Sequence, residues 1–208
     1  MQVLKPLDVV VALKIGCNEH RSRQLRMDAS LAQEDSIAKT ANGASNSVGN
    51  LAEALNKSKG DISRSINRLL ALDLIAERKP KNYESSASNR KYYSLKRNEM
   101  KALLCHGIRH VFAPAKTGVG RGIATGWNCP WVQSEMNPPE MPLVWAYPGG
   151  DSQGELLEPL YPNMPDAAHK DKGLYVLLSL VEVMRTGKPR ELKYAEQLLR
   201  GKIEELYS

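Results

Sequence analysis

The stretch SVGNLAEALNKSKGDISRSINRLLALDLI, residues 47–75, carries the clearest local pattern in this chain. Ser47 is a residue type that caps helices, and Leu51 and Leu55 lie four positions apart. This spacing predicts a helix that begins at Ser47. The KSKG segment at residues 57–60 is expected to end that helix in a turn.

A second, more strongly patterned helix is predicted over residues 61–72, with Ser58 or Asp61 as its N-cap. One face is apolar and contains Ile62, Ile66, Leu69 and Leu70. The opposite face is polar and contains Ser63, Arg64, Asn67 and Arg68. We therefore expect the apolar face to join a core and the polar face to meet solvent or a partner.

Two strand-like segments, LIAER at residues 74–78 and KYYSLK at residues 91–96, follow this helix. They predict an antiparallel hairpin, and the polar run between them is too long for a tight turn. Upstream, Pro6 opens a helix that is predicted to end near Ile15. Residues 17–46 are interpreted as an insertion, either holding a small helix from Asp28 to Lys39 or disordered.

This order of helices followed by a hairpin resembles the MarR-type and related bacterial winged helix-turn-helix regulators, over roughly residues 5–97. The resemblance implies an α+β, mainly helical fold in which the helix of residues 61–72 enters the DNA major groove. The insertion at residues 17–46 is longer than such domains usually carry at this place, and it bears on dimer geometry.

The resemblance also implies which residues contact DNA. Arg64 and Arg68 would pair with guanine or hold a phosphate, and Asn67 would pair with adenine. Ser58, Lys59 and Ser63 would hold the DNA backbone at the start of the helix. The wing would add basic side chains suited to phosphates or to a neighbouring minor groove, namely Lys79, Lys81, Arg90 and Lys91.

Charge placement agrees with a polyanionic partner. Residues 47–97 contain eleven Lys or Arg and five acids, a balance equal to the net charge of +6 for the whole chain of 208 residues. The alternative interpretation is that these cations form an ordinary solvated surface.

The remainder, residues 99–208, is predicted as a separate region that dimerises, senses a ligand or binds a protein. Asn98 would cap a helix that continues to residue 112. Residues 113–165 are rich in Pro, Gly and Trp and are expected to be irregular or short-stranded. The chain is predicted to end in a helical hairpin, because Gly187 and Pro189 separate two amphipathic segments at residues 170–187 and 189–207.

Other chemical sites find less support in the sequence. The segment TGVGRGIATG at residues 117–126 lacks the lysine and hydroxyl of a Walker loop and is interpreted as a turn. Four residues could be assembled into a metal site, but their spacing matches no zinc signature: Cys105, His106, His110 and Cys129. The aromatic residues could line an effector pocket, although core packing is the simpler interpretation: Trp127, Trp131, Trp145, Tyr147, Tyr161 and Tyr175. No cofactor and no metal are expected.

Three cysteines, an odd number with no CxxC pair, favour a reducing compartment, so a cytoplasmic location is expected. The apolar amino terminus is interrupted by Lys5, Asp8 and Lys14, so no membrane segment is expected there.

The leading hypothesis is a sequence-specific regulator of transcription, a repressor, that binds double-stranded DNA as a homodimer. The alternative is a DNA-binding antitoxin or phage-defence regulator whose carboxy-terminal domain binds a protein partner, because the two-part layout looks like that of abortive-infection antitoxins. A third hypothesis is an enzyme that uses the Gly-rich region with Cys129 or His110, but no set of residues supplies a nucleophile, a base and an anion hole.

Overall fold

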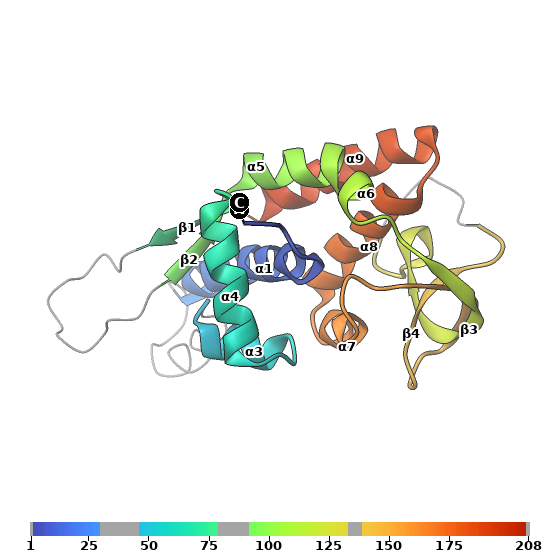
Figure 1. The fold of residues 1–208 in the computed structure, drawn as a ribbon, viewed down its shortest axis with the longest axis horizontal. Coiled ribbons are helices and arrows are strands. Elements are labelled where there is room, and N and C mark those ends of the chain that lie inside the picture. The colour runs from blue at the N-terminus through green and yellow to red at the C-terminus, as the bar shows by residue number, and fades with distance from the viewer. Residues whose placement is uncertain (1, 30–45, 79–91, 133–138, 207–208) are drawn as a thin grey trace, which may run out of the picture. The chain divides into compact units, whose positions relative to one another are not determined.

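The computed structural model describes residues 2–29, 46–78, 92–132 and 139–206 (Figure 1). The chain divides into two compact units, one comprising residues 1–99 with 204–208 and the other residues 100–203. The last residues of the chain therefore belong to the first unit, whereas the predicted division assigned them to the second. Among the described helices, none combines the length and the apolarity needed to cross a bilayer.

Within its described residues, the first unit is built mainly from three helices and a small sheet. The helices are α1 (Pro6–Ala29), α3 (Val48–Ala54) and α4 (Lys59–Ala71), and the strands are β1 (Ile75–Arg78) and β2 (Tyr92–Leu95). Helix α1 packs against α3, α4 and β2, while α4 also contacts α3 and β1. The chain is thus α+β and mainly helical. The core gathers the apolar faces of these elements, including Leu13, Ile15, Leu51, Leu55, Ile62, Ile66, Leu69 and Ile75.

The first helix is longer than its sequence pattern predicted. It continues past Ile15 to Ala29, so residues 17–29 belong to α1 and not to an insertion. Tertiary contacts hold this extension, because Glu19 accepts a hydrogen bond from the Leu95 amide at 3.0 Å and Arg23 donates to the Leu206 carbonyl at 2.6 Å. Residues 30–45, with most of the helix predicted from Asp28 to Lys39, lie outside the described residues.

A serine cap begins each of the helices α3 and α4. The Ser47 hydroxyl accepts a hydrogen bond from the Asn50 amide at 3.2 Å, which confirms the predicted start of α3. Helix α3 ends at Ala54, before the KSKG segment, and the chain reverses through Asn56 at φ 49°. Ser58 is the cap of α4, and its hydroxyl accepts from the Asp61 amide at 3.0 Å.

The predicted hairpin after α4 is present. Strand β1 pairs antiparallel with β2, from Ile75 opposite Leu95 to Arg78 opposite Tyr92. Asp73, at φ 60°, turns the chain from α4 into β1. Residues 79–91, which include the predicted contacts Lys79, Lys81, Arg90 and Lys91, lie outside the part of the chain that the structure describes.

A nearly continuous helical segment follows the hairpin in the chain. It consists of α5 (Arg97–Ala102), a π-helical turn η1 (Leu103–Gly107) and α6 (Ile108–Val111). Helix α5 begins at Arg97, so Asn98 lies inside the helix and is not its cap. Three more helices follow in the sequence: α7 (Met164–His169), α8 (Lys172–Thr186) and α9 (Pro189–Glu205).

The two predicted final helices are α8 and α9, separated at Gly187 as expected. Asp171 caps α8, because its carboxylate accepts from the Leu174 amide at 3.1 Å. The main packing partners of α8 are α6, α7 and the 3₁₀ turn η2 (Gly126–Asn128). The two helices are therefore consecutive, but α8 forms the centre of the second unit and not one arm of a simple hairpin.

Three strands of the second unit close into a small ring. Strand β3 (Lys116–Thr125) pairs antiparallel with both β4 (Leu143–Ala146) and β5 (Ser152–Leu157), and β4 pairs parallel with β5. A side chain at Gly122 would place its Cβ 1.9 Å from the Trp145 carbonyl oxygen. The segment at residues 117–126, predicted as a turn, is therefore mostly strand, with glycine where the backbones approach most closely.

The aromatic residues of the second unit are mostly core residues, as the simpler interpretation of the sequence held. Trp127, Trp145, Tyr161 and Tyr175 are buried. The ring centroids of Trp145 and Tyr175 lie 5.8 Å apart. Trp131 differs, since 47% of its surface is exposed.

Candidate nucleic-acid interface

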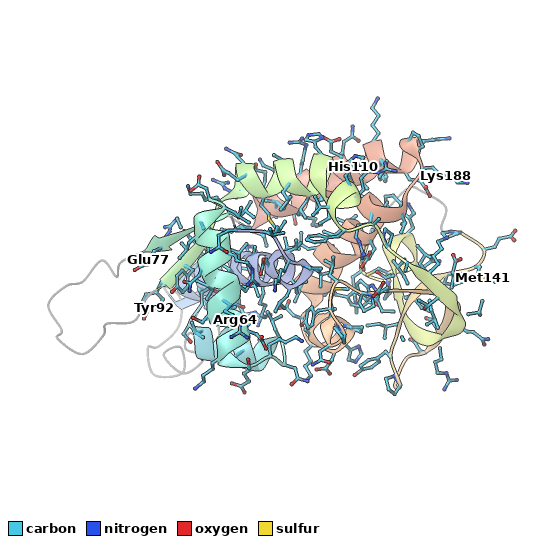
Figure 2. The ribbon with its side chains drawn as sticks, in the orientation of Figure 1. Arg64, Glu77, Tyr92, His110, Met141 and Lys188 are labelled. Atoms are coloured by element: carbon cyan, nitrogen blue, oxygen red, sulfur yellow. The ribbon has the colours of Figure 1, made fainter. Side chains whose placement is uncertain are left out.

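Helix α4 has one buried face and one exposed polar face. Its buried residues are Ile62, Ser65, Ile66 and Leu69. Ser63, Arg64 and Asn67 lie on the opposite side and are exposed, as the sequence pattern predicted. Figure 2 labels Arg64 on this helix. The exposed face thus offers a hydroxyl, a guanidinium and an amide within two helical turns.

The start of α4 is also exposed, at Ser58, Lys59 and Gly60. The Ser58 hydroxyl donates to an Asp61 carboxylate oxygen at 2.8 Å, and the Arg64 guanidinium donates to the other oxygen at 2.7 Å. These hydrogen bonds from Ser58 and Arg64 lower the pKa of Asp61, so its carboxylate is charged at neutral pH. Three residues singled out in the sequence, Ser58, Asp61 and Arg64, are thus brought together at the amino end of α4.

The pair between Arg64 and Asp61 lies on the surface, where the Arg64 side chain is 66% exposed. Exposed ion pairs of this kind contribute little net stability, because water already solvates both charges. A phosphate or a base edge can therefore take the place of the carboxylate at low cost. The geometry leaves Arg64 available for a ligand even though it has an intramolecular partner.

Arg68 lies in a different environment from Arg64, although both belong to α4. Its Nε and Nη2 atoms donate to the two oxygens of Asp8 at 2.8 Å and 2.6 Å. The Ser65 hydroxyl donates to the same carboxylate at 2.7 Å, and so does the Lys5 amide at 2.7 Å. Asp8 is fully buried and the Arg68 side chain is only 13% exposed. The hydrogen bond to Asp8 raises the pKa of Arg68, so the guanidinium is held in place as a cation.

Several of the other cations counted in the sequence also have intramolecular partners. Lys96 pairs with Asp73, and Arg97 pairs with Glu204 at 2.8 Å. Lys59 and Arg78 are exposed, the first in the opening turn of α4 and the second at the end of β1. On α4 itself, the positive charge available to a ligand therefore comes from Lys59 and Arg64, in the first two turns of the helix.

One residue that joins elements of the first unit was missed by sequence reasoning. Asn46 is buried, and its side-chain amide donates to the Ile15 carbonyl at 3.1 Å and to the Tyr93 carbonyl at 3.0 Å. It also accepts from Asn18 at 3.0 Å. Asn46 thus ties α1 to β2 just before α3 begins. An asparagine in a polar stretch carries no local signal that would reveal this role.

The cysteines and histidines are arranged differently from a catalytic or metal site. Cys105 and Cys129 are buried, and this burial raises the pKa of both thiols, which disfavours the reactive thiolate. The His106 ring lies 3.3 Å from the Arg200 guanidinium, and His110 is exposed at the end of α6 (Figure 2). Across the described ranges, no three His, Cys, Asp or Glu side chains are grouped closely enough to hold a metal ion.

No protein-family model matches this sequence, and no match is found among curated proteins or among solved structures.

Proposed function

We propose that this protein is a sequence-specific regulator of transcription, a repressor, that binds double-stranded DNA through a winged helix-turn-helix in its first unit. Helix α4 is the recognition helix, and the β1–β2 hairpin is the base of the wing. The order of three helices followed by an antiparallel hairpin supports this proposal. Figure 1 shows α3 and α4 consecutive along the chain, with the hairpin directly after α4.

The observation that carries the proposal is the polar face of α4, which is exposed while the opposite face of the helix is buried in the core. Arg64 and Asn67 are three positions apart, so they project from the same side of the helix. Arginine matches the two acceptors of guanine, and asparagine matches the donor and acceptor of adenine. These two residues are therefore the base-reading pair, and Ser63 accompanies them as a phosphate contact.

The amino end of α4 holds the DNA backbone in this proposal. A helix amino end carries partial positive charge and unpaired amides, which favour an anion. Ser58 and Lys59 lie at this end and are exposed. The wing residues Lys79, Lys81, Arg90 and Lys91 are proposed as further phosphate contacts on the basis of their charge alone.

Arg68 is assigned a positioning role and not a DNA contact. Its guanidinium is engaged with the buried carboxylate of Asp8, and withdrawing it would leave that charge without its partner. Arg68 therefore fixes the rotation of α4 about its own axis. That rotation decides which side chains reach the groove.

The protein is further proposed to act as a homodimer. Two recognition helices on a symmetric dimer contact half-sites about one turn of DNA apart, which multiplies affinity. Analytical ultracentrifugation of the complex with a palindromic duplex gives the stoichiometry. Two chains per duplex are expected, and one chain per duplex would contradict the dimer.

The test begins with a duplex selected by the protein from a randomised library, and with a scrambled duplex of the same length. Fluorescence anisotropy then measures both affinities for the wild type and for Arg64→Ala with Asn67→Ala. We expect the variant to lose at least about 30-fold of its preference for the selected duplex, since two bidentate base contacts at about 1–3 kcal/mol each together contribute about 2 kcal/mol or more. The matched control is Arg121→Ala, which removes one exposed arginine from β3. If the α4 variant keeps the full wild-type preference for the selected duplex over the scrambled one, α4 is not the recognition helix.

A second candidate function is a DNA-binding antitoxin or phage-defence regulator that also binds a protein. Trp131 and Met141, 47% and 56% exposed, favour it, because exposed aromatic and Met side chains are enriched at protein interfaces. The Asn128 amide donates to the Pro139 carbonyl at 3.5 Å, so the two segments meet beside these residues. Co-purification of the full chain with the product of the adjacent gene, lost on Trp131→Ala, would support this function. A complex that survives the substitution would argue against it.

A further inference from the structure

Charge is unevenly divided within the second unit. Residues 100–112 and 186–203 contain seven Lys or Arg and two acids. Residues 113–185 contain five Lys or Arg and eight acids. The first two segments form the end of α5, η1, α6, the turn before α9 and most of α9, so basic residues predominate there and acidic residues predominate in the remainder.

The two basic segments lie side by side. His106 of η1 and Arg200 of α9 approach to 3.3 Å. Arg185 donates to the Phe112 carbonyl at 2.8 Å, which brings the end of α8 to the end of α6. The turn into α9 therefore starts next to the last turn of α6. Figure 1 shows α6 and α9 adjacent, and Figure 2 labels His110 and Lys188 at the same end of the pair.

The cations at this end are exposed, and the acids near them are engaged. Glu191 accepts from the Lys188 amide at 2.6 Å, which caps α9, and Glu196 accepts from Arg200 at 2.9 Å. Among the described residues, Arg109, Arg190 and Lys193 have no ion-pair partner. We call these three residues, with His110 and Lys188, the α6–α9 basic face.

The composition of this face fits phosphates better than a protein surface. A protein interface needs an apolar or aromatic centre. On α6 and α9 the large apolar side chain that is strongly exposed, within the described residues, is Val111. Long side chains ending in ammonium or guanidinium groups neutralise phosphates without needing a defined sequence.

We propose that the α6–α9 basic face is a second DNA-binding surface, which contacts the phosphate backbone of the duplex and reads no bases. This inference rests on the proposed function, because it assigns a second contact to the same DNA ligand. It gives the second unit a role in affinity, while discrimination between sequences remains with α4.

The test compares two full-length variants that lose the same charge. The first is Arg109→Gln with Arg190→Gln and Lys193→Gln, on the basic face. The control is Lys116→Gln with Arg121→Gln and Lys170→Gln, on β3 and after α7 in the same unit. Anisotropy against the selected and scrambled duplexes at several salt concentrations gives the slope of log affinity against log salt. Circular dichroism melting verifies that each variant is folded.

For the basic-face variant we expect the slope to fall by about 2 to 3, since each lost phosphate contact removes about 0.9. Affinity for both duplexes should fall by the same factor, and the control should keep the wild-type slope. A basic-face variant with an unchanged slope, or a control that falls equally, would overturn this inference and leave the role of α4 intact. A wild type that binds neither duplex would overturn the proposed function itself.

Discussion

Arg68 and Asp8 are sixty residues apart in sequence and form a two-point ion pair, with Nε–Oδ2 and Nη2–Oδ1 distances of 2.8 Å and 2.6 Å. Ser65 and the Lys5 amide donate to the same carboxylate. The buried charge is therefore compensated by four hydrogen bonds, which the cost of removing it from water requires. Because Ser65 and Arg68 both belong to α4, this carboxylate of α1 sets the orientation of the proposed recognition helix.

Breaking this pair should destabilise the first unit strongly. Arg68→Met keeps an unbranched apolar stem but leaves the Asp8 carboxylate buried with half of its hydrogen bonds. We expect a loss of about 3 kcal/mol in the free energy of unfolding, measured by urea denaturation followed by circular dichroism.

The same helix supplies a matched control for the Arg68 substitution. Arg64→Met removes the pair with Asp61, which lies on the surface, and should change stability by less than about 1 kcal/mol. Equal effects of the two substitutions would show that the Asp8 pair contributes no more than an exposed one.

The N-cap of α4 gives a second prediction. Ser58→Ala removes the hydroxyl that accepts from the Asp61 amide and should cost about 1 kcal/mol of unfolding free energy. Ser63→Ala, an exposed position inside the same helix, should be close to neutral or slightly stabilising because alanine favours helix. If Ser63→Ala were the more damaging of the two in urea denaturation, the capping role would be wrong.

Closure of the β3–β4–β5 ring should not tolerate a side chain at Gly122. The added Cβ would lie 1.9 Å from the Trp145 carbonyl oxygen, a backbone atom that can move only with the whole strand. We expect Gly122→Ala to lower the melting temperature sharply, by the equivalent of about 3 kcal/mol or more. Gly201→Ala in α9 meets nothing within 4 Å and should instead stabilise by about 0.5–1 kcal/mol. Similar melting temperatures for the two variants would contradict the close approach.

Glu182 gives a prediction about pH. It is fully buried, and this burial raises its pKa from 4.5 to about 7, although Arg185 and Trp145 oppose the shift. The folded state thus binds the proton more tightly than the unfolded state does. The resulting stability is complete below pH 4.5 and is lost as pH rises from about 4.5 to about 7.

Glu182→Gln isolates this effect, because glutamine resembles the protonated acid and does not titrate. Between pH 4.5 and 7, wild-type stability should fall relative to the variant by about 3 kcal/mol. Urea denaturation at a series of pH values measures the difference. Parallel pH curves for the two proteins would mean that folding leaves the pKa of Glu182 unchanged, with Arg185 at 2.5 Å offsetting the effect of burial.

Features that depend on a few neighbouring residues were predictable from the sequence. Ser47 precedes α3 and the two strands flank residues 79–91 where the pattern placed them. Helix α4 was found within two residues of its actual start, because its apolar spacing repeats over three turns. Asn56, by contrast, ends α3 with a left-handed backbone conformation that a search for Gly and Pro overlooks.

Long-range contacts account for what the sequence pattern missed. The second half of α1 was not predicted as helix, and its Glu19 and Arg23 side chains bond to distant backbone groups. Gly122 of β3 looks like part of a turn, yet a side chain there would place its Cβ 1.9 Å from the Trp145 carbonyl oxygen of the neighbouring strand. Neither feature has a local signature.

By itself, the sequence determined where α3, α4 and the two strands of the hairpin form and which face of α4 is polar, since hydrogen bonds and side-chain spacing act over three or four residues. The tertiary structure decided which of those polar residues stay available. It placed Arg68 against a carboxylate that arrives from α1, while Arg64 remains at the surface. Burial of charge is a property of packed elements, so no local pattern can separate two arginines on the same helix.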